Sequence, residues 1–352
     1  MKLLEYFKSY KSGENKLTKP FLIAEAGVNH EGSMATAKRL ITEAAQTGAG
    51  AIKFQTYKAE KIAIPNSPAY WDTTKETTTN QFDLFKKYDS FGEAEYVELK
   101  KCCDKAGIEF LSTPFDTESA TFLNNLVDAF KISSSDITNL PFIEFICRFG
   151  KPIILSTGAS NLDEIKEAVG LIESYKLPLC LMHCILNYPT ENKNANLGML
   201  LDIRRNFPNA VLGYSDHTYP QKMESLIIAN LMGAVILEKH FTHDKSLPGN
   251  DHYQAMDKED IKYFCNTMDK YYELIGSFHK KSIDSEEPAR KYARRSIVAA
   301  CDIKAGSVIK DEVLTWKRPG HGISPKYIND LLGKVAKVDI KKDDVIDWNM
   351  VE

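Results

Sequence analysis

Residues 211–242 read Val211-Leu212-Gly213-Tyr214-Ser215-Asp216-His217-Thr218, then a segment with helical spacing of apolar residues over 221–232, then Val235-Ile236-Leu237-Glu238-Lys239-His240-Phe241-Thr242. Each quoted run begins apolar and reaches a histidine, His217 or His240, at its polar end. A strand, a helix and a second strand in this order predict a βαβ unit with parallel neighbouring strands. The two imidazoles would then project at the same end of one sheet.

The same alternation extends along most of the chain. Apolar runs suited to buried parallel strands occur at 21–26, 51–55, 109–115, 129–134, 152–157, 179–184, 211–215 and 235–240. Segments with helical spacing lie between them, and Gly48, Gly107 and Gly150 stand where helices should end. Eight such units in about 250 residues predict a TIM (β/α)8 barrel. A doubly wound open sheet is the alternative, but it usually carries a glycine-rich nucleotide turn, which this sequence lacks.

Two long segments interrupt the repeat after predicted strands. Residues 56–91 follow the second strand, with Tyr70 and Trp71 near the middle, and residues 242–257 follow the eighth. Loops of this length are usually functional lids or disordered. The place of the first segment at the C-terminal end of the strands favours a lid.

The alternation ends after Gly276. Residues 281–295 are dense in charge and contain Pro288, which is typical of a linker. Short strand-like pieces follow at 296–300, 307–309 and 334–338, separated by Gly, Pro and Asp turns. We therefore predict a barrel domain over 1–280, a linker over 281–295 and a small β-rich domain over 296–352.

The bulk composition is that of a soluble globular enzyme, with 43% hydrophobic and 26% charged residues in 352. The formal net charge of -3 gives no whole-chain attraction to nucleic acid or to an anionic membrane, so neither partner is expected. No apolar run approaches the roughly 18 residues of a spanning helix. The seven cysteines form no C-x-x-C pair, which favours a reduced, cytoplasmic chain.

The predicted strand ends carry a polar set of side chains. A TIM barrel builds its active site there, and the set comprises Glu25, Lys53, Gln55, Thr113, Lys131, Ser134, Ser156, Tyr188, Ser215, His217, Glu238 and His240. Two lysines and several hydroxyls at one mouth suit a phosphate or a carboxylate. Two histidines suit a divalent metal whose shell is completed by water or a substrate oxygen. Glu25 is the natural general acid or base, with a pKa raised toward neutrality by burial.

Each of these residues taken singly is more often a structural hydrogen-bonder, and Lys53 and Lys131 could simply pair with Glu25 inside the barrel. A whole ring of unpaired polar groups would, however, be costly without a ligand. The residues alone therefore predict a metal-assisted reaction on a small anionic substrate.

Several segments, taken together, resemble the sialic acid synthase family. They are Ile23-Ala24-Glu25-Ala26-Gly27-Val28-Asn29-His30, Lys53-Phe54-Gln55, Phe130-Lys131-Ile132-Ser133-Ser134, Leu155-Ser156-Thr157-Gly158, Gly213-Tyr214-Ser215-Asp216-His217-Thr218 and Glu238-Lys239-His240-Phe241-Thr242. The tail resembles the antifreeze-like (SAF, β-clip) domain of that family at Arg294-Arg295-Ser296-Ile297 and Lys317-Arg318-Pro319-Gly320. The likeness covers residues 20–352, with both domains in order.

The resemblance implies condensation of phosphoenolpyruvate with an N-acetylated aldose to a nonulosonic (sialic-type) acid and phosphate. The aldose would be N-acetylmannosamine or a 2,4-diacetamido-trideoxyhexose. His217 and His240 would hold a divalent metal, usually Mn²⁺, with Mg²⁺ and Co²⁺ as other candidates, and Glu25 would be the acid–base carboxylate. The positions that match the phosphoenolpyruvate set are Lys53, Thr113, Lys131, Ser134, Ser156 and Ser215. Those on the sugar side are Gln55, Tyr188, Asp251 and Arg318.

The resemblance also implies a domain-swapped homodimer in which Arg318 of the small domain enters the site of the neighbouring subunit. In a monomer it would be a surface arginine beside a proline. Two departures from the family pattern lie on the sugar side: Leu186 stands where sialic acid members often have Asn, and the loop 248–257 differs. They leave the identity of the aldose open.

Two other functions remain open. The first is a 3-deoxy-sugar-acid synthase, which would use phosphoenolpyruvate and a phosphorylated aldose. No arginine cluster stands at the strand ends to bind the second phosphate. Some such enzymes use a cysteine as a metal ligand, and Cys184 is the candidate here. The second is a non-catalytic carbohydrate-binding protein in which the small domain binds the carbohydrate. Retention of Glu25, both histidines and both lysines argues against it.

Overall fold

The computed structural model describes residues 2–10, 17–249 and 251–352. The chain divides into two compact units, Met1–Gly276 and Ser277–Glu352. The division falls within a few residues of the barrel boundary predicted at 280, and the predicted linker 281–295 belongs to the second unit. Part of the loop 242–257, namely residue 250, lies outside the described residues.

The first unit is built around eight strands: β1 (Phe21–Gly27), β2 (Ala51–Thr56), β3 (Glu109–Pro114), β4 (Phe130–Ile132), β5 (Ile153–Ser156), β6 (Leu179–Cys184), β7 (Val211–Asp216) and β8 (Ile236–His240). They pair in parallel in the order β3-β2-β1-β8-β7-β6-β5-β4. The two end strands, β3 and β4, contact each other and close the sheet. The predicted TIM barrel is confirmed, and the open doubly wound sheet is wrong.

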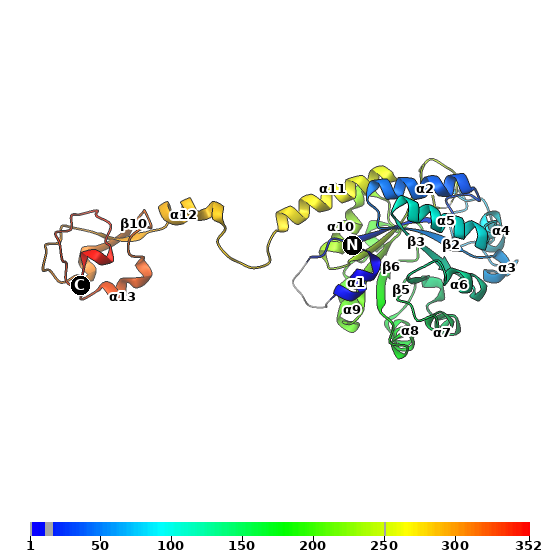
Figure 1. The fold of residues 1–352 in the computed structure, drawn as a ribbon, viewed down its shortest axis with the longest axis horizontal. Coiled ribbons are helices and arrows are strands. Elements are labelled where there is room, and N and C mark those ends of the chain that lie inside the picture. The colour runs from blue at the N-terminus through cyan, green and yellow to red at the C-terminus, as the bar shows by residue number, and fades with distance from the viewer. Residues whose placement is uncertain (1, 11–16, 250) are drawn as a thin grey trace. The chain divides into compact units, whose positions relative to one another are not determined.

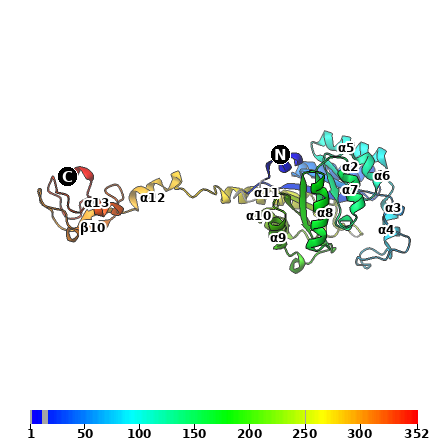
Figure 2. The same cartoon turned by 90° about the horizontal axis from the view of Figure 1, so that it is seen from below.

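Helices surround the strands (Figures 1 and 2). They are α1 (Leu3–Ser9), α2 (Met34–Thr47), α3 (Ala59–Ile62), α4 (Gln81–Tyr88), α5 (Glu93–Ala106), α6 (Thr117–Leu123), α7 (Leu140–Cys147), α8 (Leu162–Ser174), α9 (Met199–Asn206), α10 (Glu224–Leu231) and α11 (Lys258–Ile275), with 3₁₀ turns η1 (Ser134–Asp136), η2 (Asn192–Asn194) and η3 (Gln221–Met223). Gly48 and Gly107 end α2 and α5 in the left-handed conformation that favours glycine. The helix predicted over 221–232 is broken, because Lys222 and Met223 have positive φ angles that cannot continue it.

Strand alternation produces two layers of core. Outward-facing residues pack against the helices, while inward-facing ones such as Ile23, Leu111 and Ile154 fill the barrel. Leu3 and Tyr6 of α1 join this inner layer and are buried. Helix α1 has no counterpart among the predicted elements, because seven residues are too few to display a clear apolar period. It covers the N-terminal end of the barrel interior, so the polar groups collect at the opposite end.

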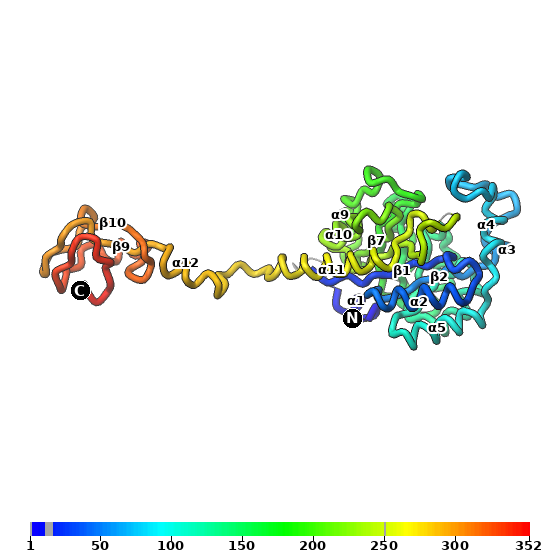
Figure 3. Tube along the Cα trace, turned by 90° about the horizontal axis from the view of Figure 1, so that it is seen from above, coloured from blue at the N-terminus to red at the C-terminus, as the bar shows by residue number. Residues whose placement is uncertain are grey.

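The long insertion after β2 carries α3 and α4. Figure 3 shows both helices beyond the end of β2. Between them the chain makes an isolated bridge from Pro68 to Asn80, and the indole Nε1 of Trp71 donates to the carbonyls of Glu76 and Thr78, 3.2 Å from each. The insertion is therefore an ordered segment folded around Trp71.

The second unit has its own apolar core, which includes Ile297, Ile309 and Leu331. Its elements are η4 (Asp284–Glu286), α12 (Glu287–Tyr292), β9 (Ser296–Ala299), η5 (Asp311–Val313), β10 (Leu314–Lys317), η6 (Pro325–Tyr327), α13 (Ile328–Leu331) and η7 (Trp348–Met350). The regular sheet is a single antiparallel pair, β9 with β10. The strands predicted at 307–309 and 334–338 are wrong in extent, because those segments make isolated bridges such as Val308 to Val335. None of the helices in the described part of the chain has the length and apolar character needed to cross a membrane.

Candidate active site

A polar pocket of about 60 Å³ lies at the C-terminal end of the barrel, and all eight strands or the loops that follow them line it. Side chains two residues apart on a strand share a face, which is why each strand contributes from its inward positions. Every residue predicted for catalysis or for phosphoenolpyruvate lines this inner pocket: Glu25, Lys53, Thr113, Lys131, Ser134, Ser156, Ser215, His217 and His240. The structure therefore brings the whole predicted set together.

Glu25 lies at the centre of the contacts in the inner pocket. Its Oε1 accepts hydrogen bonds from Lys53 Nζ at 2.8 Å and from Gln55 Nε2 at 3.2 Å, and its Oε2 lies 2.8 Å from His240 Nδ1. Burial alone would raise the pKa of Glu25, but the Lys53 ammonium and His240 hold it well below its usual range. The expectation of a raised pKa is wrong, because two cationic neighbours outweigh burial. Glu25 is an ionised carboxylate.

The β1 backbone makes room for this carboxylate at Gly27. Its φ of +52° lies in the left-handed region, and a Cβ there would stand 2.8 Å from Oε2 of Glu25. The pairing register between β1 and β2 also shifts between Glu25 and Gly27. The irregularity at the end of β1 therefore depends on glycine and directs Glu25 into the pocket.

Glu238 completes the charge pattern of the inner pocket. Its Oε1 lies 3.7 Å from Lys53 Nζ and 3.6 Å from Lys131 Nζ, and it accepts a hydrogen bond from Ser215 Oγ at 3.3 Å. Lys53 thus pairs with Glu25 as the structural alternative suggested, whereas Lys131 pairs with Glu238. Burial lowers the pKa of Lys131, assisted by the Lys53 ammonium and opposed by Glu238. Glu238 was absent from the predicted roles, although its place two residues before His240 puts both on one face.

His217 is a neutral imidazole with a defined tautomer. Its Nδ1 lies 2.7 Å from the carbonyl oxygen of Ile185 and must donate, because a carbonyl only accepts. Its Nε2 is therefore the nitrogen with the lone pair. Burial, followed by the neighbouring His240, lowers the pKa of His217 to about 3.

His240 faces two carboxylates. Its Nδ1 lies 2.8 Å from Glu25 Oε2 and 3.9 Å from Asp251 Oδ2, and its ring centre is 5.3 Å from that of His217. Burial alone would lower its pKa, but Asp251 and Glu25 raise the pKa of His240 to about 9. Although Nδ1 and Oε2 are close, neither makes an aligned hydrogen bond within the described residues. A bound divalent cation would compete with the proton of this ring.

The donor atoms of the inner pocket fit a divalent cation with an incomplete protein shell. Among residues that the structure describes, no group of three or more His, Cys, Asp or Glu is placed to hold a metal ion. His217 and His240 offer two imidazoles, and the buried atoms Glu25 Oε2, Ser156 Oγ, Glu238 Oε2 and His240 Nδ1 lack aligned protein partners within the same residues. Buried polar atoms left in this way can be satisfied by water, by a cation or by a substrate.

Cys184 is poorly suited as a metal ligand. Its Sγ lies 3.8 Å from Nδ1 of His217, the nitrogen already engaged with Ile185. Burial raises the pKa of its thiol to about 11. The geometry disfavours a cysteine-ligated metal, because the sulfur faces Nδ1 of His217 and not the lone-pair nitrogen Nε2.

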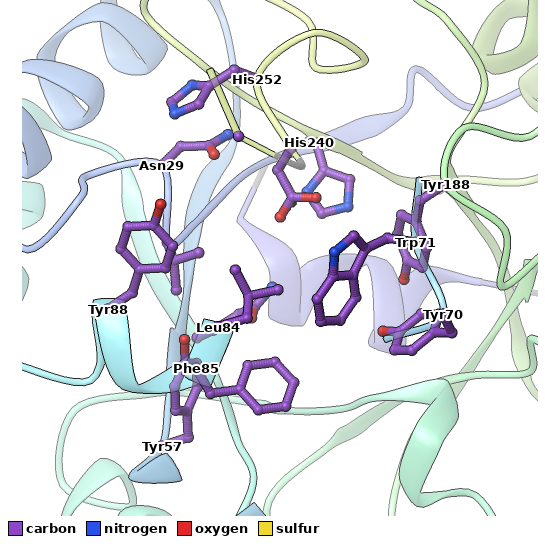
Figure 4. Close-up of a pocket in the computed structure, with 14 residues that line it drawn as sticks. Asn29, Tyr57, Tyr70, Trp71, Leu84, Phe85, Tyr88, Tyr188, His240 and His252 are labelled. Atoms are coloured by element: carbon purple, nitrogen blue, oxygen red, sulfur yellow. Dashed lines mark ion pairs between the residues drawn. The ribbon is translucent and has the colours of Figure 1, made fainter. Parts of the chain in front are cut away.

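A second pocket of about 100 Å³ adjoins the first and shares Gln55, Tyr188 and His240 with it. Figure 4 shows Trp71, Tyr70 and Tyr188 together on one side and Tyr57 and Tyr88 on the other. The insertion after β2 supplies most of this aromatic wall, and of its aromatic residues only Tyr70 and Trp71 were singled out from the sequence. The complete lining is Val28, Asn29, Gln55, Tyr57, Tyr70, Trp71, Leu84, Phe85, Tyr88, Tyr188, His240, Gly249, Asp251 and His252. It includes no lysine or arginine from the part of the chain that the structure describes.

Three of the four residues predicted on the sugar side line this outer pocket, namely Gln55, Tyr188 and Asp251. The fourth, Arg318, belongs to the second unit, where its side chain is exposed. The outer pocket thus joins the inner one at His240, so a molecule bound in it would meet the metal-ligand candidates.

Comparison with known proteins identifies the family. Residues 40–280 match the model described as the NeuB family, and residues 294–352 match the SAF domain. The chain belongs to the NeuB family. This NeuB-family chain is 36% identical over 340 residues to the N,N'-diacetyllegionaminic acid synthase of Legionella pneumophila, with 94% of each chain covered. It is 37% identical over 336 residues to the synthase of the same name from Campylobacter jejuni, covering 94% of this chain and 99% of that one.

A crystal structure of the N-acetylneuraminic acid (sialic acid) synthetase of Leptospira borgpetersenii, in complex with citrate, matches the NeuB-family chain with a TM-score of 0.67 and 32% identity. The match covers 79% of this chain and 94% of that one. The predicted resemblance to the sialic acid synthase family, the SAF domain and the classification as an enzyme of the synthase type are confirmed.

Proposed function

We propose that this chain condenses phosphoenolpyruvate with a neutral N-acetylated aldose to give a nonulosonic acid and inorganic phosphate. The observation that carries the proposal is the convergence of Glu25, both lysines and both histidines in one pocket of a NeuB-family barrel. Lys53 and Lys131 supply the cationic charge for the phosphate and carboxylate of phosphoenolpyruvate. The hydroxyls of Thr113, Ser134, Ser156 and Ser215 supply donors around them.

The two histidines would hold a divalent cation, and we propose Mn²⁺, with Mg²⁺ and Co²⁺ as substitutes. When bound, such a cation polarises the sugar aldehyde as a Lewis acid. The fixed tautomer of His217 makes Nε2 available as a ligand, because Nδ1 is held by Ile185. The buried ring of His240 would bind as the neutral form once its proton is displaced.

The protein groups then serve a balanced reaction. C3 of phosphoenolpyruvate forms the new bond to the aldehyde carbon, whose oxygen takes up a proton, and a water molecule adds at C2. The bond from C2 to the phosphate oxygen then breaks, the water oxygen becomes the C2 carbonyl, and the two protons of the water molecule end on the new hydroxyl and on the released phosphate. Glu25 is ionised and can accept the proton of the water molecule. Lys53, which contacts Glu25 and Thr113, keeps that carboxylate ionised and would also bind the phosphate of phosphoenolpyruvate.

The outer pocket supports a neutral acceptor over a phosphorylated one. Its lining offers no lysine or arginine among the described residues, and the carboxylate of Asp251 would repel a sugar phosphate. Its aromatic wall suits acetamido and deoxy methyl groups, which pack on ring faces. We therefore favour a 2,4-diacetamido-trideoxyhexose as the acceptor, and we expect N-acetylmannosamine to be the poorer substrate.

Phosphate release with a panel of aldoses tests the acceptor. We expect the highest kcat/KM with a 2,4-diacetamido-trideoxyhexose and at least about 10-fold less with N-acetylmannosamine, because loss of apolar contacts costs 1–3 kcal/mol. N-acetylmannosamine 6-phosphate and arabinose 5-phosphate should give no release above that of His217→Ala, which serves as the background. Release only with a phosphorylated aldose would instead assign a 3-deoxy-sugar-acid synthase.

Arg318 provides a prediction about assembly. We propose that it enters the acceptor pocket of a neighbouring subunit in a domain-swapped homodimer, because Arg318 is exposed and its guanidinium can donate hydrogen bonds to the acetamido carbonyl of a neutral sugar. Arg318→Ala should raise KM for the sugar about 10-fold or more and leave KM for phosphoenolpyruvate unchanged, as loss of a charge-assisted hydrogen bond costs 1.5–3 kcal/mol. Arg295→Ala, another exposed arginine of the second unit, is the control.

Subunit mixing separates the swapped arrangement from a merely local effect. Arg318→Ala and His217→Ala chains are unfolded, mixed and refolded together. A hybrid dimer would contain one complete site, so at a sugar concentration well below the wild-type KM, where Arg318→Ala homodimers contribute little, activity should recover to about a quarter of the wild-type value. If hybrid dimers are shown to form and no activity is recovered, Arg318 lies outside the partner's site.

A further inference from the structure

A buried ion pair joins β7 and β8 directly behind the two histidines. Asp216 and Lys239 are partners in the register of these strands, and Lys239 Nζ lies 2.8 Å from Asp216 Oδ2. Their side chains are 0% and 1% exposed. Because adjacent strand residues point to opposite faces, the pair lies on the outer face of the barrel while His217 and His240 face the pocket.

The carboxylate of Asp216 is fully occupied by the protein. Oδ1 accepts from Tyr214 Oη at 2.8 Å and from the backbone nitrogen of Thr218 at 2.9 Å. Oδ2 accepts from Ser225 Oγ at 2.7 Å and from Thr218 Oγ1 at 3.1 Å, besides Lys239. A group so engaged has no contact with substrate, so any role in the reaction must act through its neighbours.

The hydrogen bonds of the pair enclose His217. The contact from Asp216 to the N–H of Thr218 closes an Asx turn across His217. Lys239 Nζ donates to the carbonyl of the same Thr218, so both backbone polar groups that follow His217 are held. The carbonyl of His217 itself accepts from the N–H of Thr190 at 2.8 Å.

Asp216 with Lys239 is also the last pair in the β7–β8 ladder, and each histidine stands one residue beyond it. We propose that Asp216 and Lys239 are positioning residues that fix the spacing of His217 and His240 for a shared metal ion. The ion pair reinforces this last rung of the ladder, and beyond it the hydrogen bond from Lys239 Nζ to the carbonyl of Thr218 links the two ligand-bearing segments. The inference rests on the metal site of the proposed function.

The test measures Mn²⁺ affinity of the purified chain by calorimetry, without substrate. Lys239→Met should weaken Mn²⁺ binding about 10- to 100-fold, the usual effect of removing an outer partner of a metal ligand. Tyr214→Phe removes only one hydrogen bond to Asp216, keeps the ion pair, and should weaken binding by a smaller factor. Tyr272→Phe is the matched control, because it also loses a partly buried tyrosine hydroxyl, which is bonded to Thr18 and Asn230.

A positioning role leaves a kinetic signature that a loss of stability does not. In Lys239→Met, kcat should fall at low Mn²⁺ and recover at high Mn²⁺, while phosphoenolpyruvate binding stays unchanged because Lys53 and Lys131 lie on other strands. Wild-type Mn²⁺ affinity in folded Lys239→Met and in Tyr214→Phe would overturn the inference. If Lys239→Met fails to fold, the Mn²⁺ affinity of Tyr214→Phe is compared with that of Tyr272→Phe, and equal affinities would overturn the inference. No Mn²⁺ binding by the wild type would overturn the metal site itself.

Discussion

His217→Ala is expected to abolish metal-dependent turnover. Its Nε2 is the nitrogen with the free lone pair, since Nδ1 donates to Ile185, and alanine leaves His240 as the sole imidazole of the pair. Lewis-acid assistance is worth several kcal/mol, so the loss in kcat should be on the order of 10³-fold or more. Steady-state phosphate release over a Mn²⁺ titration measures it.

The matched control for that variant is His183→Gln. His183 is also buried, lies on the neighbouring strand β6 and points away from the pocket, with Nε2 2.8 Å from the carbonyl of Ala195. The glutamine amide nitrogen lies about as far from the backbone as Nε2 does, so it can still donate to that carbonyl. Its turnover should keep the wild-type dependence on Mn²⁺. Full activity of His217→Ala in chelator-treated buffer would remove the metal from the account.

Glu25→Gln should lower kcat by about 10²- to 10⁴-fold, the usual contribution of a general base. The amide keeps the shape of the carboxylate but cannot accept the proton of the water molecule. Binding of phosphoenolpyruvate should hold or tighten, because the variant removes a negative charge beside Lys53. Separate measurement of kcat and of phosphoenolpyruvate affinity distinguishes the two effects.

Glu238→Gln is the informative comparison for Glu25→Gln. Glu238 lies 3.7 Å from Lys53 and 3.6 Å from Lys131, and its hydrogen bond joins it to Ser215 rather than to His217 or His240. Its substitution should change KM for phosphoenolpyruvate far more than kcat. A Glu25→Gln enzyme with kcat close to that of the wild type would assign the proton transfer to another group.

The barrel could be predicted because parallel strands buried on both faces leave long apolar runs, and because the polar residues at their ends fall at one mouth. The convergence of Glu25, Lys53, Lys131, His217 and His240 follows from that topology. Glu238 could also have been assigned a role, since it shares the inward face of β8 with His240. The aromatic wall of the outer pocket could not be predicted, because the insertion has no repeating apolar period from which the directions of Tyr88 or Leu84 could be inferred.

The charge states of Glu25 and His240 could not be predicted from the sequence, for a different reason. Glu25 and His240 are register partners across β1 and β8, which are the first and last strands of the barrel in sequence. Their contact exists only because the sheet closes, and together with the Lys53 ammonium it reverses the pKa shift that burial alone predicts for Glu25. Likewise, the short β segments after residue 300 pair only as isolated bridges, since turns interrupt them before a ladder can extend.

The central claim is that the inner pocket joins phosphoenolpyruvate to a neutral N-acetylated aldose. The most direct measurement is product mass together with phosphate, using the purified chain, Mn²⁺, phosphoenolpyruvate and a 2,4-diacetamido-trideoxyhexose. The account predicts equal amounts of phosphate and of an acid whose mass equals that of the sugar plus pyruvate. Phosphate released without that acid, or at the same rate without the sugar, would contradict it.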